Sequence, residues 1–522
     1  KMGIAKDDLR RLQACLFYLL NQSVSQGHTY ITLETLLAQC GKLTQADSEE
    51  IQTALKSLCD ANMLVVESLN GAPDAQGVYL KPLYDAETTV ANRLVALQSV
   101  PVPPSPIDPE QITAEVVRKL AIKPSGVQLS VLEDILSHRV VIITGGPGTG
   151  KTTLVRSICT VYETLGKQIC LAAPTGRAAR RLSEVSGRPA ATIHKLLGYH
   201  PSEGRFERDP GNPLDIDVLI VDEASMVDVL LMQSLISALP MTAVLVMVGD
   251  IFQLPPVGPG NVLSDIIRSG RVRAYELKEI FRQAQESPIV MNAHRVRNGR
   301  MLQLDHSDPE QADSEFYFVT QHEPKAAART VVDLCTRILP ERFGLDPVVD
   351  VQVLTPMHKG EVGTIQLNQV LQNALNPAES QISGKPGRFR PGDKVMHLKN
   401  NYQKDVFNGD IGMVTDVDVD DEQFLVDYDG RMVTYDVDES DELSLAYAIS
   451  VHKSQGSEYP AVIVPLMTQH FVLLQRNLLY TAMTRGRKLV VLVGTRRALE
   501  IAMKNDKPFQ RLSGLASRLA RT

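Results

Sequence analysis

A glycine-rich stretch in the first third of the chain has the residue types and spacing that bind a nucleotide phosphate. Residues 145–153 read GGPGTGKTT, directly after the apolar residues 140–143 and before a helix-compatible stretch. The glycines let successive backbone N–H groups point at phosphate oxygens, Lys151 supplies a positive charge, and the Thr152 hydroxyl can ligate Mg²⁺. A glycine-rich turn can also join a strand to a helix without a ligand, but GKT after an apolar strand favours a nucleotide. The predicted contacts are Gly146, Gly148, Thr149, Gly150, Lys151, Thr152 and Thr153.

Two adjacent carboxylates follow another apolar run, about 70 residues downstream. Asp222 and Glu223 end the run 218–221. The carboxyl ends of parallel strands face the ligand side of an α/β sheet. Asp222 would therefore hold Mg²⁺ near Thr152, and Glu223 would orient or deprotonate the attacking water. Such a pair is weak evidence alone, but it gains weight after a phosphate loop, because the two strands can be neighbours in one sheet.

Four further polar residues could complete a phosphoryl-transfer site. Gln253 follows a third apolar run, and its amide can bind both water and a γ-phosphate, although an ordinary proline-rich surface loop is an equal alternative. Arg282 and Arg485 lie near the ends of two α/β regions, where an arginine can neutralise a γ-phosphate, whereas either one alone is more often a solvated charge. Gln128 precedes the phosphate-loop strand, and its amide could pair with an adenine edge, but its position alone carries no weight.

Several basic clusters suit the backbone of a nucleic acid. Arg177, Arg180 and Arg181 fall on one face of a predicted helix, as phosphodiester contacts would require. Small polar and basic groups occur at 192–195 and 450–456, although a lone histidine is more often structural. A later segment combines cations with aromatic rings, which fits phosphate contacts plus base stacking on single strands. Its members are Lys385, Arg388, Phe389, Arg390, Lys394, Lys399, Tyr402, Lys404 and Phe407.

Composition narrows the possible classes of protein. The 522 residues are too many for one core, so three or four domains are expected. No run of about 18 apolar residues occurs, so we expect no membrane span. A net charge of −7 excludes global steering towards nucleic acid, so any such binding needs a local basic groove. The six cysteines lack C-x-x-C spacing, which favours reduced thiols in a cytoplasmic protein over a zinc or redox site. The chain begins with Lys1 rather than Met and has no signal-peptide pattern, so we expect that sequence normally precedes it.

The order of apolar runs and turns predicts an α/β protein with added modules. Residues 1–100 read as helices followed by a hairpin, a winged-helix-like pattern that would bind DNA or protein, although sparse basic residues favour a packing role. A proline-rich linker follows, and strands alternate with helices in two regions, 101–285 and 286–522. Short strands between 384 and 442 predict a small β-barrel inserted in the second region. The acidic run 414–420 lacks the glycine and glutamate of a calcium loop, so a strand with buried valines is the better interpretation.

The set of motifs and their order resemble those of the superfamily 1 helicases, and the residues within the motifs are similar to those of the stand-alone RecD-like branch. The resemblance covers about residues 120–495, and residues 1–100 also look like the helical module that precedes that motor. The motifs are GGPGTGKTT, APTGRAA, TIHKLLG, VDEASMVD, GDIFQLPPVGPG, EIFRQ, ISVHKSQGSEYP and LLYTAMTRGR. This chain departs from the family in lacking a further N-terminal region and in having no tryptophan, so any base stacking must use Phe, Tyr or His.

The resemblance implies a fold and a set of site residues. The fold would comprise two RecA-like parallel-sheet P-loop domains with ATP between them, an inserted SH3-like barrel, and a β-hairpin at about 199–214. Lys151, Asp222, Glu223, Gln253, Arg282 and Arg485 would act on phosphate, Mg²⁺ and water, and Gln128 would contact adenine. Single-stranded DNA would cross both domains along Thr175, Arg177, His194, Lys359, Tyr402, His452, Lys453 and Ser454.

The function implied by the resemblance is an ATP- and Mg²⁺-dependent DNA helicase that moves 5′→3′ on single strands and opens duplexes at junctions. A cytoplasmic, monomeric motor is expected, with DNA-repair or single-strand-binding proteins as possible partners. One alternative is a DNA-stimulated ATPase that remodels protein–DNA complexes with little unwinding. A second alternative is a non-motor P-loop enzyme, which would not need the second α/β region with Arg485 and the cluster 452–454.

Overall fold

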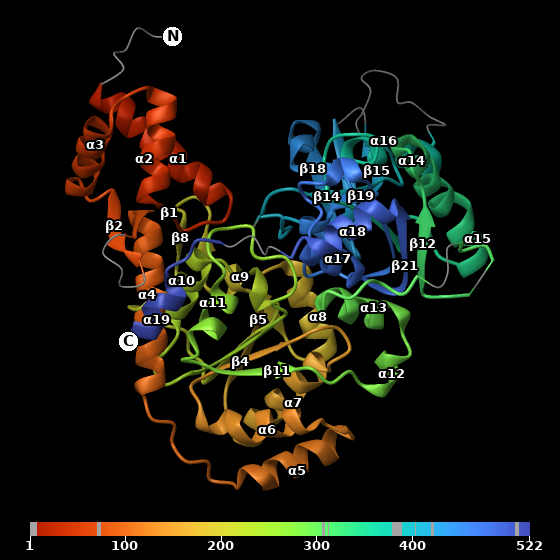
Figure 1. Ribbon diagram of the computed structural model, residues 1–522. Coiled ribbons are helices and arrows are strands. Elements are labelled where there is room, and N and C mark those ends of the chain that lie inside the picture. The colour runs from red at the N-terminus through yellow and green to blue at the C-terminus, as the bar shows by residue number, and fades with distance from the viewer. Residues whose placement is uncertain are drawn as a thin grey trace.

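The protein, seen here in a computed structural model, consists of two α/β domains side by side, with smaller modules attached to each (Figure 1). The structure describes residues 8–69, 75–304, 308–311, 313–377, 389–401, 403–418, 422–506 and 511–521, without the side chains of residues 282 and 283. Within these ranges, no helix combines the length and apolar character that a bilayer crossing requires.

The N-terminal module places three helices against a three-stranded sheet. Its helices are α1 (Leu9–Ser25), α2 (Leu33–Thr44) and α3 (Ser48–Asp60), and its strands are β1 (Tyr30–Thr32), β2 (Leu64–Ser68) and β3 (Gln76–Leu80). The order β1-β3-β2 is antiparallel throughout. The turn expected between β2 and β3 lies outside the described residues. Helix α4 (Lys81–Ser99) then runs along the first α/β domain and packs against α10.

The first α/β domain is built on a six-stranded parallel sheet with helices on both faces. The strand order is β11 (Arg273–Leu277), β4 (Val140–Gly145), β10 (Val244–Gly249), β9 (Val218–Val221), β5 (Ile169–Ala173) and β6 (Ala190–Thr192). Its central strands are continuous apolar runs, because both faces are covered. One face is covered by α5 (Pro109–Leu120), α6 (Gly126–Asp134), α7 (Lys151–Thr164) and α8 (Gly176–Ser186). The other face is covered by α4, α10 (Val229–Ala238) and α11 (Val262–Ser269).

The second α/β domain has a five-stranded parallel sheet of its own. The strand order is β12 (Phe316–Thr320), β21 (Gly486–Gly494), β20 (Tyr459–Leu466), β13 (Val351–Thr355) and β19 (Ala448–Ser450). One face packs on α13 (Pro288–Arg297), α17 (Arg476–Met483) and α18 (Arg496–Lys504). The other face packs on α14 (Pro324–Asp333), α15 (Leu339–Phe343) and α16 (Thr364–Leu375). The short helix α12 (Arg282–Gln285) precedes α13 and lies beside the first domain.

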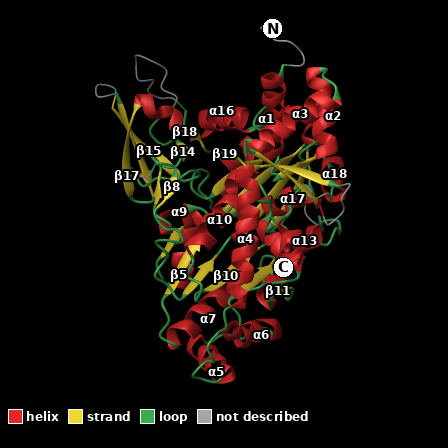
Figure 2. Cartoon of the chain, turned by 90° about the vertical axis from the view of Figure 1, so that its left-hand side faces the viewer, coloured by secondary structure: helices red, strands yellow, loops and turns green. Residues whose placement is uncertain are grey.

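A five-stranded antiparallel module interrupts the second domain between α16 and β19, at the upper left of Figure 2. Its strand order is β17 (Arg431–Asp436), β16 (Gln423–Tyr428), β15 (Ile411–Asp418), β14 (Lys394–His397) and β18 (Leu443–Leu445). Residues 414–418 of the acidic run lie in β15, as expected, and residues 419 and 420 lie outside the described residues. A bulge between Val414 and Asp416 resets the alternation, so Val414 and Val417 both pack inward while Asp416 and Asp418 face solvent.

A short hairpin projects from the first domain within the expected range. Strands β7 (Tyr199–His200) and β8 (Arg205–Phe206) pair in antiparallel register. Gly204, with φ of +63°, allows the left-handed turn between them. Tyr199 packs against Phe206, with 5.1 Å between the ring centroids, and both rings lie against His194 at the base of the hairpin.

The C-terminal tail does not stay with the second domain, which corrects the expected range 286–522. Helix α19 (Leu515–Arg521) packs against α4 and α11 of the first domain, beside the label C in Figure 1. A fully buried carboxylate explains this return. Glu87 accepts hydrogen bonds from the Thr29 hydroxyl (2.7 Å), from the Gly514 backbone (3.0 Å) and from Arg518 (3.3 Å). Sequence patterns could not predict this contact, because its partners are more than 400 residues apart.

Candidate functional site

The phosphate loop lies between β4 and α7, at the carboxyl edge of the first sheet. Gly148 and Gly150 have φ of +72° and +78°, so the loop adopts a backbone that side chains at these two positions would strain. The Lys151 ammonium donates to the carbonyl oxygens of Gly145 (2.6 Å) and Gly146 (2.9 Å). The Lys151 ammonium, the backbone N–H groups of the glycine turn and the N-terminus of α7 together form a donor set that fits nucleotide phosphates.

Residues of the interdomain connection cover this loop. The Phe281 backbone N–H donates to the Gly148 carbonyl oxygen (3.2 Å), and a Cβ on Gly148 would lie 2.6 Å from that of Ala284. From α13, the His294 ring hydrogen-bonds the Pro147 carbonyl oxygen through Nε2 (3.1 Å). The connection from the first domain to the second therefore runs directly over the predicted phosphate site.

The acidic pair follows β9 at the same edge of the sheet. The expectation that β9 neighbours β4 is wrong, because β10 lies between them and pairs in parallel with both. Asp222 is still close enough for the Lys151 charge to act on it, although burial and the Glu223 carboxylate raise the pKa of Asp222 above its usual value. Glu223 has φ of +50°, a strained backbone for a non-glycine residue. A buried carboxylate with a raised pKa suits a divalent cation, which would stabilise its ionised form.

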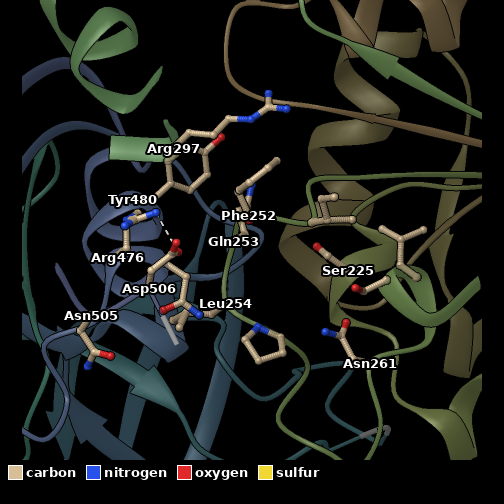
Figure 3. Close-up of a pocket in the computed structure, with 15 residues that line it drawn as sticks. Ser225, Phe252, Gln253, Leu254, Asn261, Arg297, Arg476, Tyr480, Asn505 and Asp506 are labelled. Carbon is tan, nitrogen blue, oxygen red and sulfur yellow. Dashed lines mark ion pairs between the residues drawn. The ribbon is translucent and has the colours of Figure 1, made fainter. Parts of the chain in front are cut away.

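Gln253 lies on the loop that follows β10, between the two domains. It is 8% exposed, and its Oε1 has no hydrogen-bond partner in the structure. Figure 3 shows Gln253 beside Phe252 and Tyr480, with Ser225 facing them across a cavity of about 250 Å³. The Ser225 hydroxyl is also buried without a partner. Two unsatisfied polar groups at an interdomain contact fit a site whose contacts change when the domains move.

The other predicted nucleotide residues are engaged elsewhere. The Gln128 side chain is buried, accepts from the Ser125 backbone (3.0 Å) and donates to the Thr149 carbonyl oxygen (3.3 Å), so its amide braces the phosphate loop instead of presenting an adenine-binding edge. Arg485 is 2% exposed and donates to carbonyl oxygens of its own domain, at Thr481 (3.3 Å) and Ser457 (3.1 Å). Arg282 begins α12, but its side chain lies outside the described part of the structure.

A second cavity, of about 680 Å³, runs between the two domains and reaches the inserted module and the N-terminal module. Four predicted DNA contacts line it, namely Thr175, Arg177, His452 and Lys453. Its lining also includes His358, Asn408, Asp410 and Arg511, which were not predicted. Desolvation in the cavity lowers the pKa of His452, and the charges of Arg511 and His358 lower it further. The cationic lining residues Arg177, Lys453 and Arg511 outnumber the one acidic lining residue, Asp410. This local excess of positive charge provides a basic groove in a chain whose net charge is negative.

Side chains of the second domain contact the predicted arginine face of α8. Arg177 donates to the Tyr459 hydroxyl (2.9 Å) and to the Ser457 hydroxyl (3.1 Å). Arg181 pairs with Glu458 (2.6 Å), and Arg180 pairs with Asp429 of the inserted module. The expectation that all three arginines present one free face to a phosphodiester backbone is therefore wrong for this conformation. They tie the first domain to the second.

Of the remaining predicted DNA contacts, His194, Lys359 and Ser454 are not among the residues that line this cavity. His194 packs at the base of the hairpin, and burial lowers its pKa. Ser454 is fully buried and donates to the Val451 carbonyl oxygen (2.7 Å), so it shapes the backbone turn. Lys359 is exposed beside the cavity residue His358. Tyr402 lies outside the described residues.

Three described members of the basic and aromatic segment are engaged within the protein. Phe389 belongs to the core of the module, Lys394 is buried and donates to the Val351 carbonyl oxygen (3.1 Å), and Lys404 pairs with Glu439 (2.5 Å). Lys385 and Arg388 lie outside the described residues. The expectation that this segment forms a surface for single strands is therefore wrong for these three side chains.

Sequence reasoning missed the residues that join the two sites. Arg511 donates to the Pro256, Gly258 and Gly260 carbonyl oxygens, and so fixes the far end of the Gln253 loop. Thr481 accepts from the Leu254 backbone (2.9 Å). The Gln455 amide donates to the Leu254 carbonyl oxygen (2.8 Å). The prolines after Gln253 were equally compatible with an ordinary surface loop, and nothing in the sequence pointed to these distant partners.

A DNA helicase of known sequence matches the chain along nearly its whole length. It is 36% identical over 513 residues to the protein named ATP-dependent RecD2 DNA helicase from Deinococcus radiodurans, which covers 97% of this chain and 68% of that one. The chain belongs to the RecD-like helicase family. The RecBCD enzyme subunit RecD of Mycobacterium tuberculosis is 30% identical over 462 residues, which covers 79% of each chain. These matches confirm the resemblance of the motifs.

Family models match three separate parts of this RecD-like chain. An AAA domain matches residues 128–259, and a UvrD-like helicase C-terminal domain matches residues 445–493. The SH3 domain of ATP-dependent RecD-like DNA helicases matches residues 367–428, which confirms the inserted SH3-like module of this RecD-like fold. Among solved structures, the Pif1 helicase from Bacteroides is 22% identical with a TM-score of 0.44, over 71% of this chain and 92% of that one.

Proposed function

We propose that this RecD-like protein is an ATP-dependent DNA helicase that translocates 5′→3′ on single-stranded DNA and separates duplex strands. The observation that carries the proposal is one loop that belongs to both candidate sites. At one end, Asp250 accepts from the Tyr480 hydroxyl, which lies beside Gly146 of the phosphate loop. At the other end, Leu254, Pro255 and Pro256 line the interdomain cavity. A change at the γ-phosphate would therefore move part of the DNA path directly.

The nucleotide site would use side chains from the first domain for chemistry. Lys151 and the loop N–H groups would hold the phosphates, and Glu223 would orient the attacking water. Thr152 and Asp222 fit the ligand set for Mg²⁺, which supplies positive charge to the phosphate oxygens when it is bound. The Oε1 atom of Gln253, which has no partner among the described residues, would accept from the attacking water, and its NH₂ group would donate to the γ-phosphate.

Stepping would come from closing and opening the contact between the domains. The ion pairs of Arg180 and Arg181 hold the present contact, and both arginines are partly exposed. Exposed ion pairs contribute little net stability, so this contact can exchange for phosphodiester contacts. ATP binding would then favour one arrangement of the domains and hydrolysis the other, which turns chemistry into movement along DNA.

The direct test is ATP hydrolysis by the whole chain with and without single-stranded DNA. We expect single strands to raise kcat at least about tenfold, because both sites share one loop. Hydrolysis that is indifferent to DNA would favour a non-motor P-loop enzyme. Deletion of residues 199–214 separates the remaining alternatives. A helicase would lose unwinding and retain DNA-stimulated hydrolysis, whereas a remodelling translocase would lose neither its hydrolysis nor its movement on DNA.

Lys453→Ala should weaken the binding of single-stranded DNA about five- to tenfold at low salt, because one phosphate contact is lost. Lys453 lines the interdomain cavity, where its ammonium donates to Asn408 (2.6 Å). Fluorescence anisotropy over a salt series would measure the affinity, and the slope of log K against log salt should become shallower by about 0.7. Lys325→Ala, at an exposed lysine of α14 outside the cavity lining, is the matched control. Equal losses for both variants would contradict a DNA path through this cavity.

Cellular context follows from this activity as a further part of the proposal. Junctions of single- and double-stranded DNA would be its substrates, and DNA-repair or single-strand-binding proteins would be its partners. A monomer is sufficient for the mechanism, because one chain supplies both α/β domains. The cytoplasm is the location that this proposal assigns to it.

A further inference from the structure

One tyrosine of the second domain reaches the nucleotide side of the first. Tyr480 lies in α17, and its hydroxyl donates to Oδ2 of Asp250 at 2.6 Å. Both residues are only 1% exposed, although 230 positions separate them in the sequence. A hydrogen bond to a carboxylate is stronger than one between neutral groups, and burial makes either partner costly to leave alone. This contact therefore fixes one domain against the other at a single point.

The carboxylate that Tyr480 holds also shapes the loop that carries Gln253. Oδ1 of Asp250 accepts from the Phe252 backbone (3.0 Å), and the Asp250 carbonyl oxygen accepts from the Gln253 backbone (3.2 Å). Among the described residues, Oε1 of Gln253 has no hydrogen-bond partner. Asp250 therefore shapes the turn on the N-terminal side of Gln253, while Thr481 and Gln455 hold Leu254 on its other side.

The same hydroxyl lies beside the phosphate loop. A Cβ added to Gly146 would lie 3.1 Å from the Tyr480 hydroxyl oxygen and 3.1 Å from Cε1 of His294. Figure 3 shows the Tyr480 ring beside Phe252 and Gln253, with Arg297 above them. The guanidinium of Arg297 stacks on the Phe252 ring at 4.1 Å from its centroid. Burial and the Asp250 charge raise the pKa of Tyr480 well above its usual value, so the phenol remains a donor at neutral pH.

We propose that Tyr480 is a positioning residue for ATP hydrolysis, which acts through Asp250 to place Gln253 at the γ-phosphate. This role rests on the proposed function, since it assigns Gln253 to the γ-phosphate. Through Tyr480, the second domain controls whether the first domain has its γ-phosphate contact in place. Tyr480 does not itself touch the reacting atoms. Because it lies in α17, a movement of the second domain on DNA would move Tyr480 with it.

The experiment measures kcat and KM for ATP with saturating single-stranded DNA in Tyr480→Phe, in Gln253→Ala, and in the double variant. Removal of the hydroxyl should lower kcat about tenfold and change KM less than about twofold, because the lost interaction positions a group for the transition state. If Tyr480 acts through Gln253, Tyr480→Phe should lower kcat less than about twofold when Gln253 is already alanine. Equal effects in both backgrounds would overturn the proposal.

Two further variants separate positioning from general stability. Asp250→Asn keeps the size of the side chain and removes the negative charge that accepts from Tyr480. It should reproduce the kcat loss of Tyr480→Phe. It also tests the proposal if Tyr480→Phe folds poorly. Tyr317→Phe is the matched control, because Tyr317 is fully buried in the sheet of the same domain. It should change the melting temperature at most and leave kcat unaltered. A kcat loss that tracks melting temperature across all three variants would overturn the positioning role.

DNA stimulation of the wild-type protein distinguishes a failure of the proposed function from a failure of the role assigned to Tyr480. Absence of DNA stimulation in the wild type would overturn the proposed function. Normal stimulation in the wild type with undiminished turnover of Tyr480→Phe would overturn only the role assigned to Tyr480.

Discussion

Lys151→Ala should abolish ATP hydrolysis, with a loss of at least about 10³-fold in kcat/KM, while the protein stays folded. The ammonium is the only cation that the loop itself offers to the β- and γ-phosphates, and such charge stabilisation is worth several kcal/mol in the transition state. The fold should survive, because Lys151 donates only to two loop carbonyl oxygens, and each such bond contributes about 1 kcal/mol. Phosphate release measures the activity, and circular dichroism with thermal melting measures the fold.

Lys167→Ala provides the control for Lys151. Lys167 lies in the same domain, and its ammonium pairs with Asp217 at 3.3 Å on the surface. This variant should hydrolyse ATP like the wild type. DNA-stimulated turnover that persists in Lys151→Ala would refute the phosphate site.

Arg485→Ala should lower kcat for ATP hydrolysis by about 10³-fold or more and change ATP affinity less than about threefold. An arginine that reaches the γ-phosphate from a second domain stabilises charge that develops only in the transition state, which is why kcat falls and binding does not. In the structure, the guanidinium binds the Thr481 and Ser457 carbonyl oxygens of its own domain. This prediction therefore requires that the arginine exchange these partners when the domains rearrange around ATP.

Arg485→Lys tests whether the effect is catalytic or structural. Lysine keeps the charge but lacks the planar fork, so it should recover only a small part of the activity. Equilibrium binding of a fluorescent ATP analogue, single-turnover hydrolysis and thermal melting are the three measurements. Equal losses of ATP affinity and turnover, or a melting temperature that explains the lost activity, would contradict a transition-state role.

The parts of the fold that follow from local sequence could be predicted. Continuous apolar runs bounded by polar residues, such as 140–143 and 218–221, predicted the parallel strands, and residues 145–153 predicted the phosphate loop. These predictions hold because strand formation and tight turns depend on neighbouring residues. Strand order depends on packing across the whole sheet, and the insertion of β10 between β4 and β9 therefore had no local signal.

The residue types of the candidate site could be predicted, but the residues that they contact could not. Arg177, Arg180 and Arg181 were correctly placed on one helical face, yet their partners lie about 250 to 280 residues away and could not be read from spacing. The same limit applies to Tyr480 and Arg511, whose roles come from contacts with the Gln253 loop. Gln128 was identified by its position, but its amide is occupied by the Ser125 cap and by the phosphate loop.

The most direct test of the account is the unwinding of a short DNA duplex that carries a single-stranded overhang on either its 5′ or its 3′ end. The whole chain would be mixed with each duplex and ATP, and strand separation would be followed by fluorescence, with Lys151→Ala as the inactive control. The account predicts ATP-dependent separation of the duplex with the 5′ overhang and little separation of the duplex with the 3′ overhang. Separation of the 3′-overhang duplex alone, or of neither duplex despite DNA-stimulated hydrolysis, would contradict it.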